Sequence, residues 1–168
     1  MKRTTITVIL LFALLPLSAV PVGISLSTWG ASSSVASGEG VHATVGAFIA
    51  PARRVEVEAA VVLALTPHLG QDLLGSIFVS YPFAGPLYHR GGEATLYYNG
   101  LVGLGYLGGW DERNQRPVHS LALRFIPFTI GGSYYGRRER ALAFTLLYDL
   151  PSKGWGVSWS LLGFDAYL

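Results

Sequence analysis

The stretch VEVEAAVVLAL, residues 55–65, alternates between two faces at every second residue. One face is entirely apolar, and the other carries Glu56, Glu58, Ala60, Val62 and Ala64. This is the period of a β-strand, whose successive side chains point to opposite sides. The preceding stretch VHATVGAFIA, residues 41–50, alternates in the same way, and only residues 51–54 separate the two. The two stretches therefore predict an antiparallel hairpin.

Alternation of the same kind recurs along the rest of the chain. Pro127 is expected to end or bend one of the resulting strands, because proline cannot donate a ladder hydrogen bond. Eight strands with no helix between them predict an all-β fold, an eight-stranded antiparallel up-and-down β-barrel, because closure removes the exposed strand edges. The further strands are expected within residues 22–29, 74–83, 93–107, 118–130, 141–150 and 155–168, the first of them being the weakest.

Length and composition narrow the class of protein. The 168 residues suit one domain, since ordinary domains have about 100–200 residues. Hydrophobic residues make up 51% of the chain and charged residues only 13%, whereas about 25% charged is usual. The chain has no cysteine, which excludes disulfides, thiolate metal sites, a cysteine nucleophile and a lipid-anchored N-terminal cysteine.

The N-terminal segment has the pattern of a secretory signal. Two basic residues precede an apolar stretch at residues 6–17, and small residues follow it. We predict a signal peptide at residues 1–22 and a single β-barrel domain at residues 23–168, with cleavage after either Ala19 or Ser25. An uncleaved anchor is the alternative, although the apolar stretch is shorter than the roughly 20 residues of a membrane helix.

The remaining charges are balanced but unevenly placed. Without the two basic residues of the signal, ten basic residues face ten acidic ones, so nucleic acid is not a predicted partner. Six of the ten fall in the connections after the second, fourth and sixth strands, which share one end of an up-and-down barrel. Anionic headgroups at that end, or plain solubility of turns, would explain them. These residues are Arg53, Arg54, Arg90, Arg137, Arg138 and Arg140.

Alternation alone does not decide which face of a barrel is outside. A soluble, lipocalin-like barrel buries its apolar face, and an outer-membrane barrel does the reverse. The membrane is favoured because the apolar face is continuous, the opposite face is rich in small residues, and aromatic residues recur near strand ends, as an interfacial girdle requires. These aromatic residues are Trp29, Tyr81, Tyr98, Tyr106, Trp110, Tyr134, Tyr148 and Trp155.

The last strand carries the most specific motif. Gly163, Ala166 and Leu168 match the pattern polar, x, Gly, x, x, hydrophobic, x, terminal aromatic or hydrophobic residue, whereas Leu161 stands at the polar position and Leu168 is not aromatic. With this motif and its strand pattern, the chain resembles the small eight-stranded outer-membrane barrel proteins of diderm bacteria. The resemblance implies an outer-membrane location, contacts with outer-membrane lipid and with the barrel-assembly machinery, and a monomeric state.

The phase of this last strand is ambiguous. If Leu162 and Phe164 face lipid, Trp155 and Trp159 face inward in a regular strand. A bulge near Leu161 and Leu162 would switch the phase and turn both tryptophans outward.

Charged residues on the polar faces predict an ion-pair network inside the barrel. Arg124 is expected to pair with Glu56, Glu58 or Glu93, because all four lie on the polar side of their strands and an unpaired charge there is costly. An eight-stranded barrel has an interior just wide enough for side chains. The interior is therefore predicted to be a polar plug and not a diffusion pore.

Catalytic signals are weak. His119 and Ser120 suggest a comparison with lipid A deacylases, but adjacent strand residues point to opposite faces and the His-x-Ser spacing is absent. Gly103, Gly105 and Gly108 match a dinucleotide-binding spacing, yet they lie inside a predicted strand with no helix following. No catalytic, metal-binding or cofactor-binding residue is predicted.

The function expected from the sequence is that of a non-enzymatic outer-membrane barrel protein, serving envelope integrity or surface interaction through its loops. Two alternatives stay open. One is a lipid-modifying barrel enzyme, and the other is a soluble periplasmic barrel that binds an apolar ligand.

Overall fold

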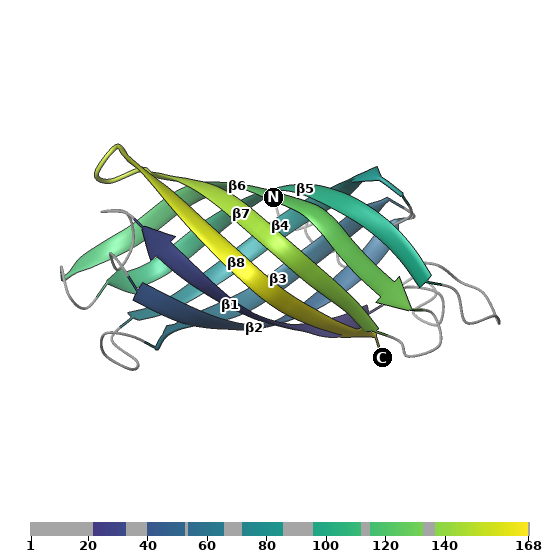
Figure 1. The fold of residues 1–168 in the computed structure, drawn as a ribbon. Helices are drawn as coiled ribbons and strands as arrows, with labels where there is room; N and C mark the ends of the chain where they lie inside the picture. Colours follow the sequence, from purple (N-terminus) through teal and green to yellow (C-terminus); the bar gives the residue numbers. More distant parts are fainter. Residues whose placement is uncertain are drawn as a thin grey trace, which may run out of the picture.

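The computed structural model describes residues 22–32, 40–52, 54–65, 72–85, 96–111, 115–132 and 137–167. Each strand pairs antiparallel with the next, and β8 pairs with β1, which closes a barrel (Figure 1). The prediction of an all-β, eight-stranded up-and-down barrel is confirmed. The described residues contain no helix long and apolar enough to cross a bilayer. The strands are β1 (Val22–Ser32), β2 (Gly40–Ala52), β3 (Val55–Ala64), β4 (Asp72–Ala84), β5 (Leu96–Asp111), β6 (Arg116–Gly132), β7 (Arg137–Asp149) and β8 (Gly154–Tyr167).

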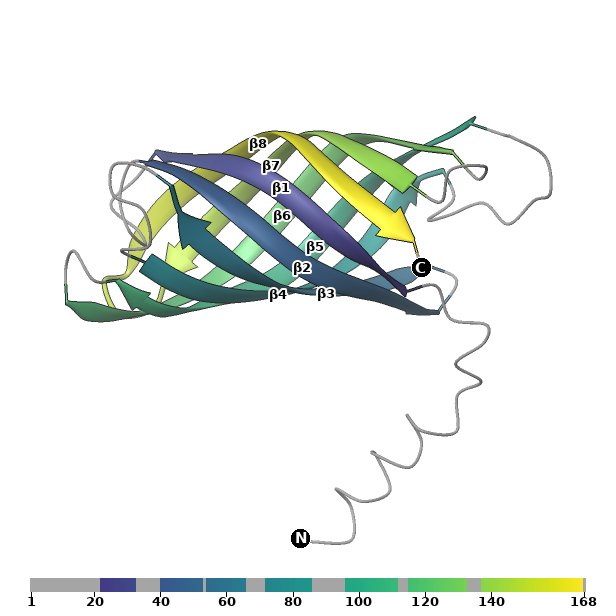
Figure 2. The same ribbon diagram turned by 90° about the horizontal axis from the view of Figure 1, so that it is seen from below.

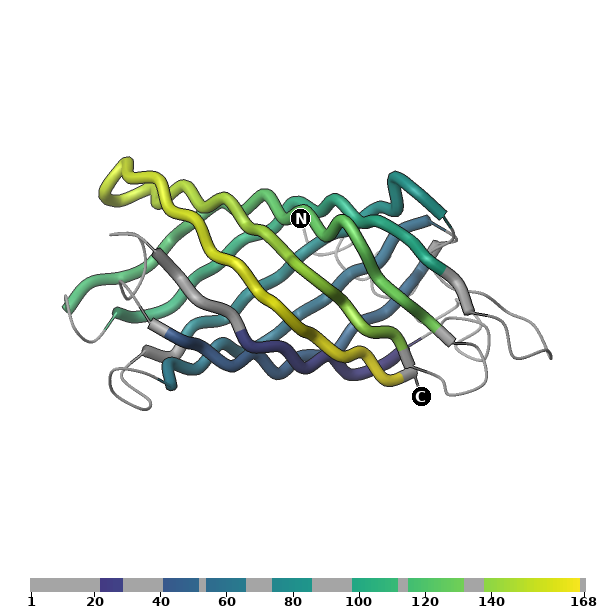
Figure 3. Tube along the Cα trace, in the orientation of Figure 1, coloured from purple at the N-terminus to yellow at the C-terminus, as the bar shows by residue number. Residues whose placement is uncertain are grey.

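The barrel has two ends. At one of them, which we call the terminal end, β1 begins and β8 finishes; β1 lies between β2 and β8 along the wall (Figure 2). At the other, which we call the hairpin end, the chain turns from β5 to β6 and from β7 to β8, and the β7–β8 hairpin projects there (Figure 3). Of the predicted signal peptide, only Val22 is described, and it is the first residue of β1.

One predicted connection is wrong. Arg137, Arg138 and Arg140 were expected between strands, but they belong to β7, which begins at Arg137. The side chains of Arg138 and Arg140 are buried in the barrel. The predicted basic turn at this position is therefore part of the interior wall.

Three neighbouring strands each contain an extra residue at the same level. In β6 it lies at Pro127 and Phe128, where pairing with β5 shifts by one residue between Asn99 and Leu101. In β7 it lies at Leu142, whose φ of 56° is left-handed. β7 keeps an unshifted register with both β6 and β8. The extra residues of the three strands therefore lie side by side in the wall. β6 therefore continues past Pro127, and the alternation of its inward and outward residues shifts there by one residue. We call this feature the bulge row; its members are Pro127, Phe128, Leu142, Leu161 and Leu162.

The third bulge resolves the phase of β8. Leu161 and Leu162 are consecutive, yet both are exposed, at 57% and 55%. Pairing between β8 and β1 shifts by one residue in this region, between Ser27 and Gly30. Ser160 Oγ donates to the carbonyl oxygens of Thr28 at 2.6 Å and Leu162 at 3.2 Å, which supports the irregular backbone. Trp155 and Trp159 therefore lie on the outer wall together with Leu162 and Phe164.

The two walls of the barrel have opposite chemistry. On the outer wall every strand exposes large apolar side chains, as at Leu104, which is 69% exposed. On the inner wall, charged and hydroxyl side chains are buried. The barrel thus buries charged side chains and exposes large apolar ones, the reverse of an ordinary soluble fold.

Candidate functional site

The terminal half of the lumen contains a cluster of six charged side chains. Glu56 and Glu58 come from β3, Arg124 from β6, Arg138 and Arg140 from β7, and Asp165 from β8. All six are buried, and three arginines face three carboxylates. We call this set the ion cluster. Since buried charges must be paired or hydrogen-bonded, its stability depends on the individual contacts.

Arg138 is the most enclosed member, with a fully buried side chain. Its Nη2 donates to both carboxylate oxygens of Glu56, at 2.9 and 2.8 Å, and its Nε donates to Asp165 Oδ2 at 2.7 Å. The guanidinium carbon also lies 5.6 Å from the centre of the Phe48 ring. Arg138 therefore joins β7 both to the adjacent strand β8 and to β3 across the lumen.

Arg140 repeats this arrangement one step further into the barrel. Its Nε and Nη2 donate to the two oxygens of Asp165, at 2.8 and 2.5 Å, which is a bidentate pair. Its Nη1 donates to Glu58 Oε2 at 3.0 Å. Because β3 and β7 lie four strands apart in a closed ring of eight, both arginines span the full width of the lumen.

Arg124 completes the cluster from a third direction. Its Nη2 lies 2.7 Å from Glu58 Oε2 and donates to Ser80 Oγ at 3.1 Å. The guanidinium stacks over the Phe78 ring, with 4.1 Å between its central carbon and the ring centre. Ser25 Oγ donates to the other oxygen of Glu58 at 2.7 Å. Glu58 thus accepts from β1, β6 and β7 at once.

The predicted network is only part of the observed one. Of the three glutamates proposed for Arg124, the structure pairs it with Glu58, while Glu56 binds Arg138. Glu93 lies outside the described residues. Arg138, Arg140 and Asp165 were not predicted as interior residues.

The bulge row is the physical reason for this omission. A regular β7 would place Arg138 and Arg140 on the same face as Leu142, which is the outer wall. The extra residue at Leu142 reverses the phase, so the two arginines point inward. The bulge in β8 has the same effect on Asp165. The available signal was the charge alternation of Arg138 and Arg140 around the intervening Glu139, which is a strand period.

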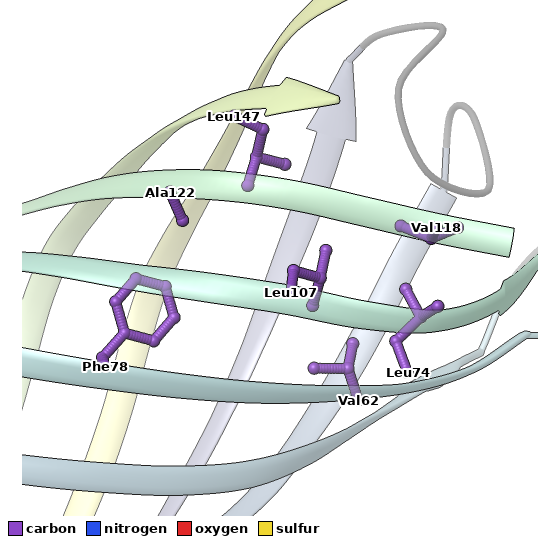
Figure 4. Close-up of a cluster of buried hydrophobic side chains, with 7 residues drawn as sticks. All are labelled: Val62, Leu74, Phe78, Leu107, Val118, Ala122 and Leu147. Carbon is purple, nitrogen blue, oxygen red and sulfur yellow. The ribbon is translucent and has the colours of Figure 1, made fainter. Parts of the chain in front are cut away.

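Beyond the ion cluster, toward the hairpin end, the lumen contains a cluster of buried apolar side chains. Side chains from five strands meet there (Figure 4), and they leave a cavity of about 80 Å³ between themselves and the ion cluster. That volume has room for a few water molecules. The interior described here is thus filled by side chains, with the ion cluster toward the terminal end and this apolar cluster beyond it. The apolar cluster consists of Val62, Leu74, Phe78, Leu107, Val118, Ala122 and Leu147.

A smaller polar group lies at the hairpin end. Asp149 accepts from Arg116 Nη1 at 3.1 Å and from Ser120 Oγ at 3.3 Å. It also accepts from the backbone and hydroxyl of Ser152 in the β7–β8 turn, at 3.2 and 2.6 Å. Asp111 lies 3.8 Å from Arg116 Nε. These contacts fix the turn to the ends of β5 and β6.

The histidines do not assemble a recognisable catalytic or metal site in the described part of the chain. His119 lies on the outer wall, where Tyr106 Oη hydrogen-bonds to its Nδ1, while the adjacent Ser120 points inward. His42 is buried in the lumen, and the other two histidines lie outside the described residues. Among the described residues, no group of three or more His, Cys, Asp or Glu side chains is placed to hold a metal ion.

The predicted assembly motif is partly described. Gly163 lies in β8 beside β1, where an added Cβ would come within 3.2 Å of Ser27 Cβ. Ala166 pairs with Ile24 of β1 and Arg137 of β7, and Leu168 lies outside the described residues. The small residue at position 163 therefore permits close packing at the strand seam that closes the barrel.

Comparison of the chain with protein-family models, curated proteins and solved structures finds no match.

Proposed function

We propose that the chain is a non-enzymatic bacterial outer-membrane barrel protein, with a side-chain-filled interior, that serves envelope integrity or surface interaction through its loops. The observation that carries the proposal is the inversion of the two walls: apolar side chains outside, and a buried ion cluster inside.

The outer wall is the main support for a membrane location. Soluble monomers rarely expose contiguous apolar patches larger than a few hundred Å². Here exposed leucine, valine, isoleucine and aromatic side chains follow one another along β2 to β8. A closed barrel leaves no unpaired strand edge, so hydrocarbon can act as the solvent of such a wall.

The ends of the barrel offer further support. At the terminal end, Arg54 in the β2–β3 turn donates from Nη1 to Tyr81 Oη at 3.1 Å, and this hydrogen bond raises the pKa of the exposed Arg54. At the hairpin end, the rings of Tyr148 and Trp155 lie 4.8 Å apart on the outer wall. Aromatic and basic side chains at both limits of an apolar band suit the two membrane interfaces. Arg53 and Arg90 of the predicted basic turns lie outside the described residues.

The ion cluster disfavours a soluble carrier of an apolar ligand, because such a carrier requires an apolar pocket where this barrel has six buried charges. A lipid-modifying enzyme is disfavoured by the separation of His119 and Ser120 on opposite walls. We therefore favour the non-enzymatic membrane protein over the soluble carrier and the lipid-modifying enzyme.

Fractionation of a diderm host that expresses the full chain tests the proposal. We expect the protein in the outer-membrane fraction, resistant to carbonate extraction. In detergent, the folded protein should migrate differently from boiled protein on a gel. Release with the periplasmic contents would overturn the proposal and favour the soluble carrier. Release of fatty acid from purified lipid A by the refolded protein would favour the enzyme.

A further inference from the structure

The outer wall is not uniformly convex. A shallow, open groove of about 610 Å³ crosses β3, β4 and β5 and reaches β2 on one side and β6 on the other. Its lining is small or apolar along most of its length, and no Asp, Glu, Lys or Arg is among the described residues that line it. The lining includes Ala59, Val61, Gly75, Ile77, Tyr106 and His119.

The strand register explains why the groove exists. Val61 pairs with Gly75, Gly75 with Gly108, and Gly108 with His119, so two glycines stand side by side in one row across the wall. A Cβ at Gly75 would meet only the carbonyl oxygen of Gly108, at 3.8 Å, which means that the space above it is open.

Gly108 has a different role from Gly75. A Cβ there would come within 2.7 Å of Tyr106 Cε1, so the tyrosine ring lies over this glycine. In this position Tyr106 Oη reaches His119 Nδ1. The groove is thus open over Gly75 and bordered on its β6 side by a tyrosine–histidine pair.

The groove is also amphipathic along the barrel axis. His119 lies three residues from Arg116, the first residue of β6, and therefore about 10 Å from the hairpin end of that strand. In the next row toward the hairpin end, Trp110 pairs with Pro117 and is exposed on the outer wall. On the opposite side of His119, toward the barrel centre, Ala59 and Ile77 continue the apolar lining.

We infer that this groove binds one acyl chain of a membrane lipid, with the His119 imidazole contacting an oxygen of the lipid ester or headgroup. The inference rests on the proposed function, because it requires the outer wall to lie in a bilayer. The open, uncharged lining suits a hydrocarbon chain.

The test uses the full chain in vesicles of palmitoyl-oleoyl phosphatidylethanolamine and phosphatidylglycerol. After mild detergent release, native mass spectrometry measures the fraction of barrels that retain a phospholipid. Gly75→Leu fills the open space over the row of glycines, and we expect it to lower retention by roughly tenfold, the scale on which pockets reject a group that is too large. Ala59→Leu fills the same groove from β3 and should act alike if Gly75→Leu does not fold.

Two further variants provide a control outside the groove and a test of the His119 imidazole. Thr28→Leu adds apolar bulk to the outer wall of β1, outside the groove, and should leave retention unchanged. His119→Phe keeps a ring but removes the nitrogen atoms, and should lower retention by about threefold, as expected for one lost hydrogen bond.

The outcomes separate the two proposals. If the barrel does not insert into the vesicles, both the proposed function and the groove site are wrong. If it inserts and both groove-filling variants retain phospholipid like the unaltered chain, only the groove site is wrong. A change in oligomeric state of Gly75→Leu with unaltered lipid retention would also overturn the inference, since it would assign the groove to a second copy of the chain.

Discussion

Arg138 has the least access to solvent among the charged side chains of the ion cluster, and its replacement tests what the cluster contributes. Arg138→Met leaves the buried carboxylates of Glu56 and Asp165 with fewer donors. We expect it to lower the free energy of unfolding by about 3–5 kcal/mol, the usual cost of breaking a buried ion pair. Urea unfolding in lipid vesicles measures the change.

The matched control for Arg138 is Arg54→Met, because Arg54 lies exposed in the β2–β3 turn. Its effect should stay within about 0.5 kcal/mol, as for most surface substitutions. Equal effects of the two substitutions would mean that burial of Arg138 adds nothing to the stability of the barrel.

The partner of Arg124 can be identified with double-mutant cycles. Arg124 contacts Glu58, whereas the carboxylate of Glu56 binds Arg138. Arg124→Met combined with Glu58→Gln should show a coupling energy of roughly 0.5–3 kcal/mol. The same substitution combined with Glu56→Gln should be closer to additive. Strict additivity of the Arg124 and Glu58 effects would contradict the observed pair.

These residues show where sequence reasoning succeeds. Arg124 and Glu58 lie in stretches of uninterrupted alternation, so their inward direction follows from counting by two. Arg138, Arg140 and Asp165 lie beyond the bulge row, where counting by two from the clear part of each strand gives the wrong wall. A single extra residue per strand is enough to hide half of the ion cluster.

At the scale of the strands, sequence periodicity indicates the bulge row in two of its three strands but not in the third. In β8 the two tryptophans and the apolar residues after Leu161 conflict in phase, and that conflict correctly indicates a bulge. In β6, Pro127 predicts an irregularity, and the structure has one. In β7 the sequence gives no sign of the bulge, because the left-handed residue is Leu142 and leucine has no preference for that backbone conformation.

The left-handed backbone at Leu142 gives a prediction for β7. Leu142→Val should destabilise the barrel by about 1–2 kcal/mol more than Leu146→Val, because a β-branched side chain adds to the steric cost of a left-handed conformation. Both leucines face outward and are similarly exposed, so the loss of apolar surface is matched. Urea unfolding of the two variants in the same vesicles gives the difference. Equal losses would argue against a left-handed residue at this position.

At the scale of the whole molecule, strand number and closure were accessible from the sequence, since eight alternating stretches of adequate length allow a closed up-and-down barrel. The register was not, because alternation is preserved when one strand slips past its neighbour by two residues. The groove over Gly75 depends on that register. Two glycines, 33 positions apart, form a row only because Gly75 pairs with Gly108.

The filled lumen predicts that the barrel does not conduct ions in steady steps. In planar bilayers the purified protein should give no stable current, because the ion cluster and the apolar cluster occupy the lumen in series. A general porin incorporated under the same conditions provides the positive control. Reproducible current steps of porin size would show that the interior is open.

The contacts across the lumen also bear on the order in which the chain can assemble. Glu56 and Glu58 belong to the first half of the barrel, but two of their arginine partners lie 82 residues further along the chain. A nascent sheet made of β1 to β5 would carry two carboxylates that have no cation in the cluster until β6 and β7 arrive. Neutralisation of these carboxylates and closure by β8 therefore come late in the chain, and a chain that stops before β7 lacks the Arg138 and Arg140 partners of Glu56 and Glu58.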